Sequence, residues 1–477
     1  MEQPLLPMLL ELTVVVTLLV LALSHLVSSR RSPPPRRLPP SPPGLPVIGH
    51  LHLLRPPVHR TFHELAARLG PLMLIRLGST GCVVASSADV ARELIHGHDA
   101  TISGRPITAL ARLFSYGFAF TTYGPQWRLL RRLCVSEVLG PRTVEQLRPV
   151  RRASLVLLLR AVLAAAARGE AADLTRELIR FSNASIIRMV ASDAPGSVAD
   201  EAQDLVKAVT GLIGAFNVED YVPLCRGWDL QGLRREAAGV HRRFDALLEK
   251  MIRHKEEARD HGRAAIADDD EHEQEDRKQA PATRQRNKDL LDILLEKADD
   301  DAAEMKLTRE NIKAFITDVV TAGSDSSAAT VEWMLAELMN HPEAMRKAAF
   351  KETLRLHPGA PIAHRMSTGE MVVRGFTVPP RTAVFINVWA IGRDPAFWED
   401  PLASCGGGRR GCPGVGLAQQ SVPAALAALV QCFDWAVADG ETGLVDMDES
   451  DVGLVCARKH PLLLRPTARL NPFPAVE

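Results

Sequence analysis

The chain has 477 residues, with 57 basic and 57 acidic side chains and 46% hydrophobic residues. This composition is typical of a folded globular protein, and the balanced charge gives no indication of nucleic-acid binding. The seven cysteines are scattered, odd in number and without the spacing of a disulfide framework. We therefore expect free thiols in a reducing compartment.

The amino terminus predicts a membrane anchor. Residues 5–27 are apolar and long enough to span a bilayer, and four arginines follow: Arg30, Arg31, Arg36 and Arg37. Positive charge on that side predicts an uncleaved single-pass anchor over residues 1–30, with the body in the cytosol. A cleaved signal peptide is the alternative, but no clear cleavage site precedes the arginines. The basic, proline-rich residues 31–50 predict a stiff hinge before a body at 51–477.

The body begins with two short apolar runs, 73–77 and 82–85, which predict strands; most of the chain after them has helical spacing. A helix is expected from Trp127, after the breaker Gly124-Pro125. Trp127 and Arg131 lie four residues apart on one face, where both could donate to a carboxylate. A packed tryptophan beside a solvated arginine is the alternative.

Further helices are expected at 174–191 and 239–255. Residues 218–223 predict a loop, which we place near a substrate entrance as a hypothesis. The densely charged residues 256–288 predict a solvated surface loop without a function.

Residues 306–340 predict a long helix, interrupted by the sequence AGSDSS at 322–327. Small and hydroxyl residues in mid-helix predict that the helix opens there. Such an opening could hold dioxygen and a water beside an iron, with Asp325 and Ser326 relaying protons. A close helix crossing at a patch of small residues is the alternative.

Two shorter elements follow. Glu352 and Arg355 lie side by side on a helix that Pro358 ends, and residues 382–388 predict a strand.

Cys412 lies among glycines and arginines, directly before a predicted helix at 419–433. The helix macrodipole and the charges of Arg409 and Arg410 favour its thiolate form. A thiolate in this setting suits a haem iron.

Three other interpretations of this stretch remain. Gly406, Gly408 and Gly411 have the spacing of a dinucleotide-binding fingerprint, but no strand precedes them. A zinc site using Cys405 and Cys412 lacks paired ligands nearby. A glycine-rich loop with a buried cysteine is the third.

In this order, the elements resemble the membrane-anchored class of the cytochromes P450, the haem-thiolate monooxygenases. The resemblance extends over nearly the whole chain, including the sequence WAIGRDP at 389–395 and the glycine-rich loop around Cys412. It implies a mainly α fold with a small β region and haem b (iron protoporphyrin IX) as cofactor. It also implies dioxygen, a small-molecule substrate and an NADPH-cytochrome P450 reductase at the endoplasmic reticulum membrane.

The resemblance also implies roles for individual residues. Cys412 would be the axial ligand of the iron, and the haem propionates would contact Trp127, Arg131, Arg365 and Arg410. The oxygen-activating groove would be lined by Ala322, Gly323, Asp325 and Ser326. Glu352 and Arg355 would lock the core beneath the haem.

Residues 228–233, 289–295 and 453–462 resemble the plant branch that oxidises flavonoids, the type II flavone synthases and flavanone 2-hydroxylases. This likeness implies a flavanone-like phenolic that is hydroxylated or desaturated.

The chain departs from the family in four places. A few dozen residues are missing between Phe350 and Lys351, and a further stretch is missing between Leu402 and Gly406. The second stretch would carry the arginine that completes the lock with Glu352 and Arg355. Cys405 stands where the family has phenylalanine, and the groove hydroxyl is Ser326 in place of threonine.

The gaps support a rival hypothesis, a shortened, non-catalytic variant that does not hold haem productively. Removing one member of a buried charge cluster typically costs about 3 to 5 kcal/mol, a large part of the net stability of a domain. A membrane-anchored binding protein unrelated to haem is a third hypothesis.

Overall fold

The computed structural model describes residues 37–114, 117–192, 196–272, 288–300, 306–342, 349–395, 408–438, 443–451, 453–471 and 473. The predicted anchor at 1–30, the first part of the hinge, Cys405 and the expected junction between Leu402 and Gly406 lie outside the described residues. The other expected junction, between Phe350 and Lys351, lies within α13.

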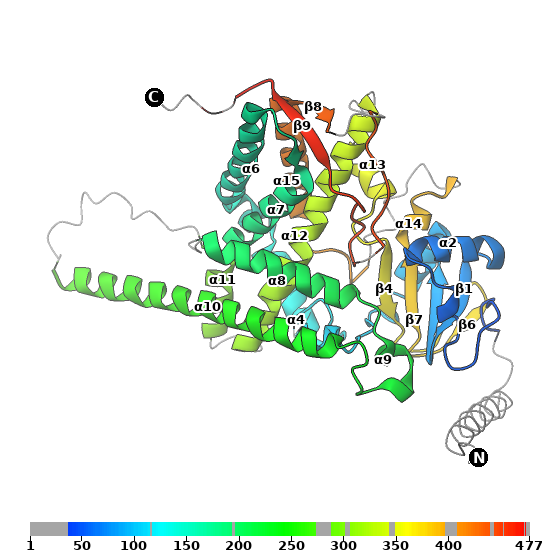
Figure 1. The fold of residues 1–477 in the computed structure, drawn as a ribbon. Coiled ribbons are helices and arrows are strands. Elements are labelled where there is room, and N and C mark those ends of the chain that lie inside the picture. Colours follow the sequence, from blue (N-terminus) through cyan, green and yellow to red (C-terminus); the bar gives the residue numbers. More distant parts are fainter. Residues whose placement is uncertain are drawn as a thin grey trace, which may run out of the picture.

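Helices make up most of the described body (Figure 1). Their bounds are α2 Val58–Leu69, α3 Ala88–Arg92, α4 Pro125–Leu133, α5 Pro141–Gln146, α6 Arg148–Arg168, α7 Leu174–Val190, α8 Gly196–Gly214, α9 Val218–Tyr221, α10 Leu233–His272, α11 Leu290–Asp299, α12 Arg309–Asn340, α13 Ala349–Leu356, α14 Val388–Ile391 and α15 Val415–Cys432. Short 3-10 or π turns are η1 Leu51–Leu53, η2 Glu93–Gly97, η3 Ala111–Phe114, η4 Cys134–Val138 and η5 Pro223–Cys225.

The strands form a small β region on one side of the helices (Figure 1). A four-stranded sheet has the order β1-β2-β7-β4, and only the β2–β7 pair is parallel. Two smaller sheets have the orders β3-β9-β8 and β5-β6. The strand bounds are β1 Leu72–Leu77, β2 Thr80–Ala85, β3 Ala172–Asp173, β4 Ile362–Met366, β5 Met371–Val373, β6 Phe376–Val378, β7 Ala383–Asn387, β8 Phe433–Val437 and β9 Leu463–Ala468.

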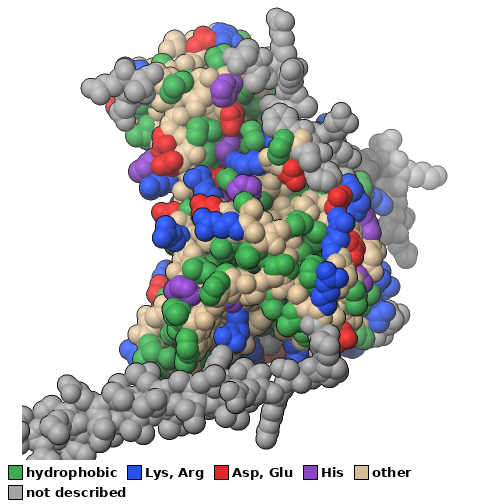
Figure 2. All heavy atoms as spheres, turned by 90° about the vertical axis from the view of Figure 1, so that its right-hand side faces the viewer, with side chains coloured by type: hydrophobic (Ala, Val, Ile, Leu, Met, Phe, Trp, Pro, Cys, Tyr) green, Lys and Arg blue, Asp and Glu red, His purple; other side chains and the backbone are tan. Residues whose placement is uncertain are grey.

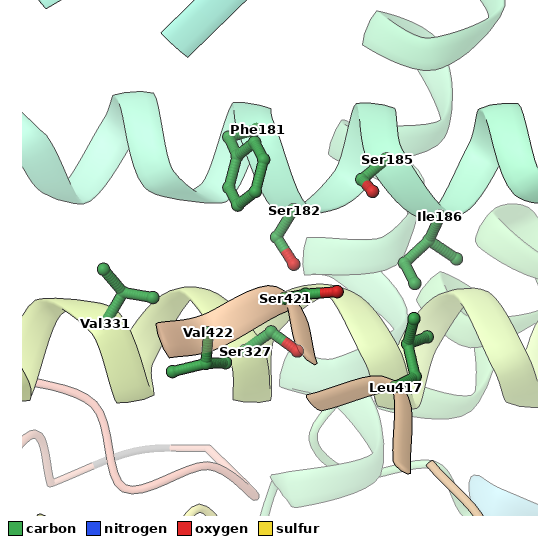
Figure 3. Close-up of a pocket in the computed structure, with 9 residues that line it drawn as sticks. All are labelled: Phe181, Ser182, Ser185, Ile186, Ser327, Val331, Leu417, Ser421 and Val422. Carbon is green, nitrogen blue, oxygen red and sulfur yellow. The ribbon is translucent and has the colours of Figure 1, made fainter. Parts of the chain in front are cut away.

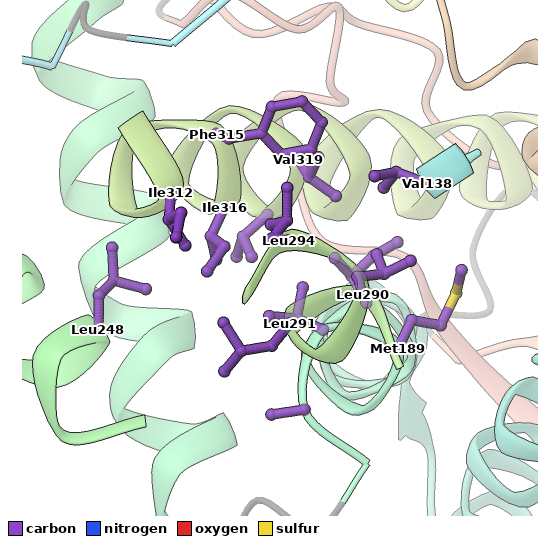
Figure 4. Packing of buried hydrophobic residues seen from close by; sticks show 14 of the residues in the cluster. Val138, Met189, Leu248, Leu290, Leu291, Leu294, Ile312, Phe315, Ile316 and Val319 are labelled. Atoms are coloured by element: carbon purple, nitrogen blue, oxygen red, sulfur yellow. The ribbon is translucent and has the colours of Figure 1, made fainter. Parts of the chain in front are cut away.

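Helix α12 is the central element of the core. It begins at a capping box, in which the side chains of Thr308 and Asn311 each accept from the backbone N–H of the other. Its first half packs against α7, α10 and α11 (Figure 4), where Phe315 and Leu291 are among the most deeply buried side chains. Its second half packs against α6, α7 and α15. Side chains of α12 thus belong to two separate hydrophobic clusters of the core. The helix therefore holds together the parts of the chain that flank the candidate site.

Side chains of all types are interspersed on the face beside the four-stranded sheet (Figure 2). Hydrophobic, basic and acidic side chains all lie on this face, and no single kind covers it.

The predicted mainly α class with a small β region is confirmed, and so are the strands at 73–77, 82–85 and 382–388. The predicted opening of the long helix at 322–327 is wrong, because α12 is continuous from Arg309 to Asn340. Ser324 and Ser326 donate to the carbonyls of Val320 and Ala322, four residues back, at 2.8 and 2.7 Å. These bonds satisfy the hydroxyls without breaking the helix.

Two predicted loops are also corrected. Residues 218–223 contain the short helix α9, whose first turn is capped by the Asn217 side chain. The charged stretch that begins at 256 continues as α10 as far as His272, after which residues 273–287 lie outside the described part.

Candidate functional site

A tight turn leads into α15 and places Cys412 three residues before that helix. Gly408 has φ of +76°, and a Cβ atom there would lie 2.6 Å from Oδ1 of Asp99, so only glycine fits. Arg409 donates to Asp99 and to the Tyr123 hydroxyl, which fixes the turn from outside. The Cys412 thiol is free and exposed. The predicted position of Cys412 before a helix is therefore confirmed, although α15 begins at Val415, earlier than expected.

Arg410 has the most constrained side chain of the turn. Its Nε, Nη1 and Nη2 atoms donate to the backbone carbonyls of Ser103, Phe118 and Thr121 at 2.8, 3.2 and 2.7 Å. The guanidinium lies 4.6 Å from the centroid of the Trp127 ring. Burial, with neighbouring arginine charges, lowers its pKa to about 9. A buried cation with a lowered pKa is stabilised by a nearby anion.

Trp127 and Arg131 lie on α4, one turn apart, as the sequence predicts. Trp127 is buried, and its Nε1 donates to the Phe118 carbonyl at 3.1 Å. The charge of Arg131 is one of the causes that lower the pKa of Arg410 and of Arg105. Both predicted side chains therefore belong to the surroundings of Arg410.

Strand β4 brings Arg365 to the same place. Its Nη2 donates to the Arg410 carbonyl at 3.5 Å, and burial together with the charge of Arg105 lowers its pKa to about 10. The neighbouring His364 is half-buried, and burial with the charges of Arg105 and Arg365 lowers its pKa to about 4. The predicted residues Trp127, Arg131, Arg365 and Arg410 are thus brought together.

Arg105 is a fourth arginine of this cluster that the sequence did not reveal. Its pKa is lowered by burial, and its Nε has no hydrogen-bond partner among the described residues. The adjacent Gly104 presses against β4, since a Cβ atom there would lie 2.8 Å from the Met366 carbonyl oxygen. Nothing in the local sequence distinguishes Arg105 from a solvated arginine, because its position depends on a strand more than 250 residues later.

Four arginines, Arg105, Arg131, Arg365 and Arg410, therefore form a cluster. The charges of the first three lower the pKa of Arg410, and the charge of Arg105 also lowers the pKa of Arg365. Such a cluster, with an unpaired buried N–H, fits a flat ligand that carries two carboxylates, like the propionates of haem. Among the described residues, no group of three or more His, Cys, Asp or Glu side chains is arranged to hold a metal ion. The nearby Cys412 thiol could add one ligand to a metal ion that a cofactor already holds.

The predicted proton-relay residues lie on α12 and point in different directions. Asp325 accepts from the Thr210 hydroxyl of α8 at 3.1 Å, and burial raises its pKa. Ser326 donates to the Ala322 carbonyl, and its Cβ lies beside Gly359 in the loop after α13. Their described hydrogen bonds are to α8 and to α12 itself, and the structure does not bring them to Cys412 through a direct bond.

The predicted lock is present as a pair. Glu352 and Arg355 form a two-pronged ion pair on α13, and Arg355 also donates to the Gly392 carbonyl. Arg355 is buried, but the side chain of Glu352 is 57% exposed. The third member of the lock, an arginine, would contact this exposed carboxylate.

A small cavity lies between α7, α12 and α15 (Figure 3). Four serine hydroxyls and five apolar side chains line it: Ser182, Ser185, Ser327, Ser421, Phe181, Ile186, Val331, Leu417 and Val422. Ser182 donates to the Gly323 carbonyl at 3.3 Å, so the cavity borders the AGSDSS segment of α12.

Comparisons with known proteins agree with one another. The sequence profile of the family described as Cytochrome P450 matches residues 39–349 and 346–403. Cytochrome P450 93G1 of Oryza sativa subsp. japonica is 62% identical over 494 aligned positions, covering 92% of each chain. The 3,9-dihydroxypterocarpan 6A-monooxygenase of Glycine max is 36% identical, covering 92% of this chain and 95% of its own. A zebra fish cytochrome P450 solved with progesterone shares the fold, with a TM-score of 0.67 at 20% identity over 86% of this chain and 100% of that chain.

The same comparisons bear on the missing segments. The 494 positions aligned with the rice protein hold 92% of this chain's 477 residues, about 439, so about 55 positions face a gap in this chain. The profile match divides at residues 346–349 and ends at residue 403. Both breaks lie beside the two positions at which the sequence predicts that segments are missing.

Proposed function

The chain belongs to the cytochrome P450 family of haem monooxygenases, and we propose that it hydroxylates or desaturates a flavanone-like phenolic, forming a flavone or a 2-hydroxyflavanone. Support for the substrate class comes from relatives whose names state it. Besides the pterocarpan monooxygenase, a flavonoid 3'-monooxygenase of Crocosmia x crocosmiiflora is 33% identical over 94% of this chain.

The observation that carries the proposal is the convergence of Arg105, Arg131, Arg365 and Arg410 beside the turn that bears Cys412. These arginines would hold the two propionates of haem b, whereas the single N–H of Trp127 is already donated to the Phe118 carbonyl. Because Arg410 is two residues before Cys412, binding of a propionate there would also fix the position of the thiolate. The two propionates would then offset part of the positive charge of the four arginines.

Bound haem supplies the iron at which dioxygen is activated. Cys412 would provide the thiolate ligand of the iron, from the turn three residues before α15. Proton transfer would involve Asp325, whose pKa burial raises, and Ser326, whose hydroxyl points in a different direction on the same helix. The raised pKa of Asp325 favours the protonated form that a proton donor requires.

We place the chain at the endoplasmic reticulum membrane, anchored once by residues 5–27, with a reductase as its electron donor. Support in the described part comes from exposed apolar side chains between α8 and α10: Phe216, Leu224, Trp228 and Leu230. One described helix, α15, is also long and apolar enough to cross a membrane, but its side chains pack into the core beside α12. We assign the anchor to residues 5–27, on the length of their apolar run.

Turnover in microsomes tests the proposal. The chain is expressed with an NADPH-cytochrome P450 reductase and supplied with a flavanone, and products are identified by mass spectrometry. A flavone or 2-hydroxyflavanone that requires NADPH and disappears in Cys412→Ala is the expected result. Turnover of other phenolics but not of flavanones would overturn the substrate class and leave the monooxygenase intact.

A second candidate function, a non-catalytic shortened variant, is favoured by the roughly 55 unmatched positions and by the half-exposed Glu352. Restoring both missing segments from the rice relative separates the two candidates. If the present chain binds haem and turns over substrate, the second candidate fails. If only the restored chain does so, the second candidate is correct.

A further inference from the structure

We propose that Asp318 is a positioning residue, whose carboxylate holds the backbone of residues 117–121 against α12 and thereby directs the Phe118 and Thr121 carbonyls toward Arg410. This inference concerns how the site around Cys412 is assembled, so it does not depend on the identity of the substrate.

The contact between Asp318 and the segment is specific. Oδ2 of Asp318 accepts from the Ala119 N–H at 2.9 Å, and the Phe118 N–H also bonds to this carboxylate. Gly117 lies so close that a Cβ atom there would overlap the Asp318 carboxylate and would lie 2.8 Å from the Ala314 carbonyl oxygen. Glycine at 117 and an acceptor at 318 are therefore both required for this approach.

The opposite edge of the same segment faces the Cys412 turn. The Phe118 carbonyl accepts from Trp127 Nε1 and from Arg410 Nη1, at 3.1 and 3.2 Å, and the Thr121 carbonyl accepts from Arg410 Nη2 at 2.7 Å. Phe118 thus donates to α12 with its N–H and accepts from Arg410 with its carbonyl. The segment is a bridge from α12 to the residue two positions before Cys412.

Further contacts explain why the bridge needs Asp318. The Phe118 ring packs on Phe315 of α12 at a centroid distance of 5.3 Å, but this apolar contact does not fix the direction of the peptide groups. Asp318 is fully buried, and its charge is the first of the causes that oppose the lowering of the Arg105 pKa. Burial raises the pKa of Asp318 to about 7, although the two backbone N–H groups and the charge of Arg105 act to lower it. One side chain therefore both orients the backbone and lies near Arg105.

Hydrogen exchange in the full chain tests the proposal without requiring haem. Asp318→Ala removes the acceptor, and we expect the amides of residues 117–119 to exchange roughly tenfold faster or more, relative to amides of α6. Gly117→Ala should cause the same local loss of protection from exchange, because it disrupts the contact from the side of the segment. Asp318→Asn keeps an acceptor oxygen and should retain most of the protection.

Thr317→Ala is the matched control, because among the described residues the Thr317 hydroxyl bonds only to the Lys313 carbonyl of its own helix. Its exchange at residues 117–119 should equal that of the unaltered chain. Equal exchange in Asp318→Ala and Thr317→Ala would overturn the proposal. If Asp318→Ala does not fold, the comparison of Gly117→Ala with the unaltered chain decides it in the same way, and unchanged exchange there overturns it.

Haem loading provides a second readout. In the reduced carbon monoxide complex, Asp318→Ala should lower the fraction of haem with the red-shifted thiolate band several-fold, and Asp318→Asn should restore it. A change in total haem without a change in that fraction would contradict the link from Asp318 to Arg410. Failure of the chain to bind haem at all would count against the proposed function, and the exchange experiment would still decide the role of Asp318.

Discussion

Arg410 joins three separate parts of the chain to the turn that carries Cys412. Its three donor nitrogens serve the carbonyls of Ser103, Phe118 and Thr121, and its flat face lies on Trp127. Only a planar guanidinium offers donors in this fork together with a stacking surface. Arg409 is its natural comparison, because it is adjacent in sequence but its side chain is 44% exposed.

We predict that Arg410→Lys destabilises the chain by about 2 to 4 kcal/mol, because buried carbonyls lose their partners. Haem affinity should also fall, by roughly tenfold or more, since an ammonium cannot reproduce the bidentate contact. Urea unfolding and haem titration measure the two effects. The control Arg409→Lys should change stability much less, because the Arg409 side chain is largely solvated. Equal effects of the two substitutions would contradict the role given to Arg410.

Glu449 is a buried carboxylate away from the candidate site. It accepts from His59 and Trp389 at 2.9 and 2.7 Å, and Arg60 lies at 3.0 Å. Burial acts to raise its pKa, but these hydrogen bonds and positive charges outweigh it and lower the pKa to about 2. The group joins α2, α14 and the carboxy-terminal loop.

This pKa predicts a pH dependence of stability. Because the pKa is about 4.5 in the unfolded chain and about 2 in the folded chain, Glu449 contributes stability above pH 4.5 that is lost as the pH falls toward 2. The full contribution is about 3 kcal/mol. Urea unfolding between pH 6 and pH 3 should show this loss in the unaltered chain and a smaller one in Glu449→Gln. The exposed Asp434→Asn serves as control, and parallel pH profiles for all three chains would refute the prediction.

At the scale of elements, local periodicity predicted most of the helices and strands. The strands β1, β2 and β7 and the helices α4, α7 and α12 lie close to their expected ranges, because each has a continuous apolar pattern of its own. Helix α9 was missed because it has only four residues and is held by contacts from elsewhere, such as Ser79 N–H to the Tyr221 carbonyl. A short helix of this kind has no periodicity to detect.

Part of the candidate site was predicted as well, because some of its residues stand in a recognisable local sequence pattern. Cys412 and Arg410 could be found because glycines and a helix surround them, and Trp127 and Arg131 because they share a helical face. Arg105 and Asp318 could not be found, since their roles depend on contacts between segments about 200 or more residues apart in the chain. The prediction that the helix opens at 322–327 was wrong because the serine hydroxyls bond within the helix.

The ion pair of Glu352 and Arg355 on α13 gives a prediction about that element. Because Glu352 is half-exposed here, Glu352→Gln should cost only about 1 kcal/mol, as expected for a partly solvated pair. In a chain with both missing segments restored, the same substitution should cost about 3 to 5 kcal/mol, because a third partner would bury the carboxylate. Urea unfolding measures the difference in four chains: the present chain and the restored chain, each with and without Glu352→Gln. The same large loss in both backgrounds would show that the lock is already complete.

At the scale of the whole molecule, the described elements keep their order and packing on both sides of the two gaps. Helix α15, which follows the second gap, packs against α6, α7 and α12, and β9 near the carboxy terminus pairs with β8 and β3. The arginine cluster likewise combines residues from before and after both gaps. The body therefore closes around the candidate site, which favours haem binding by the chain at its present length.

The most direct measurement is the difference spectrum of the reduced carbon monoxide complex, recorded for the full chain in microsomes. A strongly red-shifted Soret band that is lost in Cys412→Ala is the predicted result, because it reports a thiolate on the iron. Retention of this band in Cys412→Ala would show that another group is the ligand. A band at the position of neutral or histidine ligation in the unaltered chain, or no band, would contradict a haem-thiolate site at Cys412.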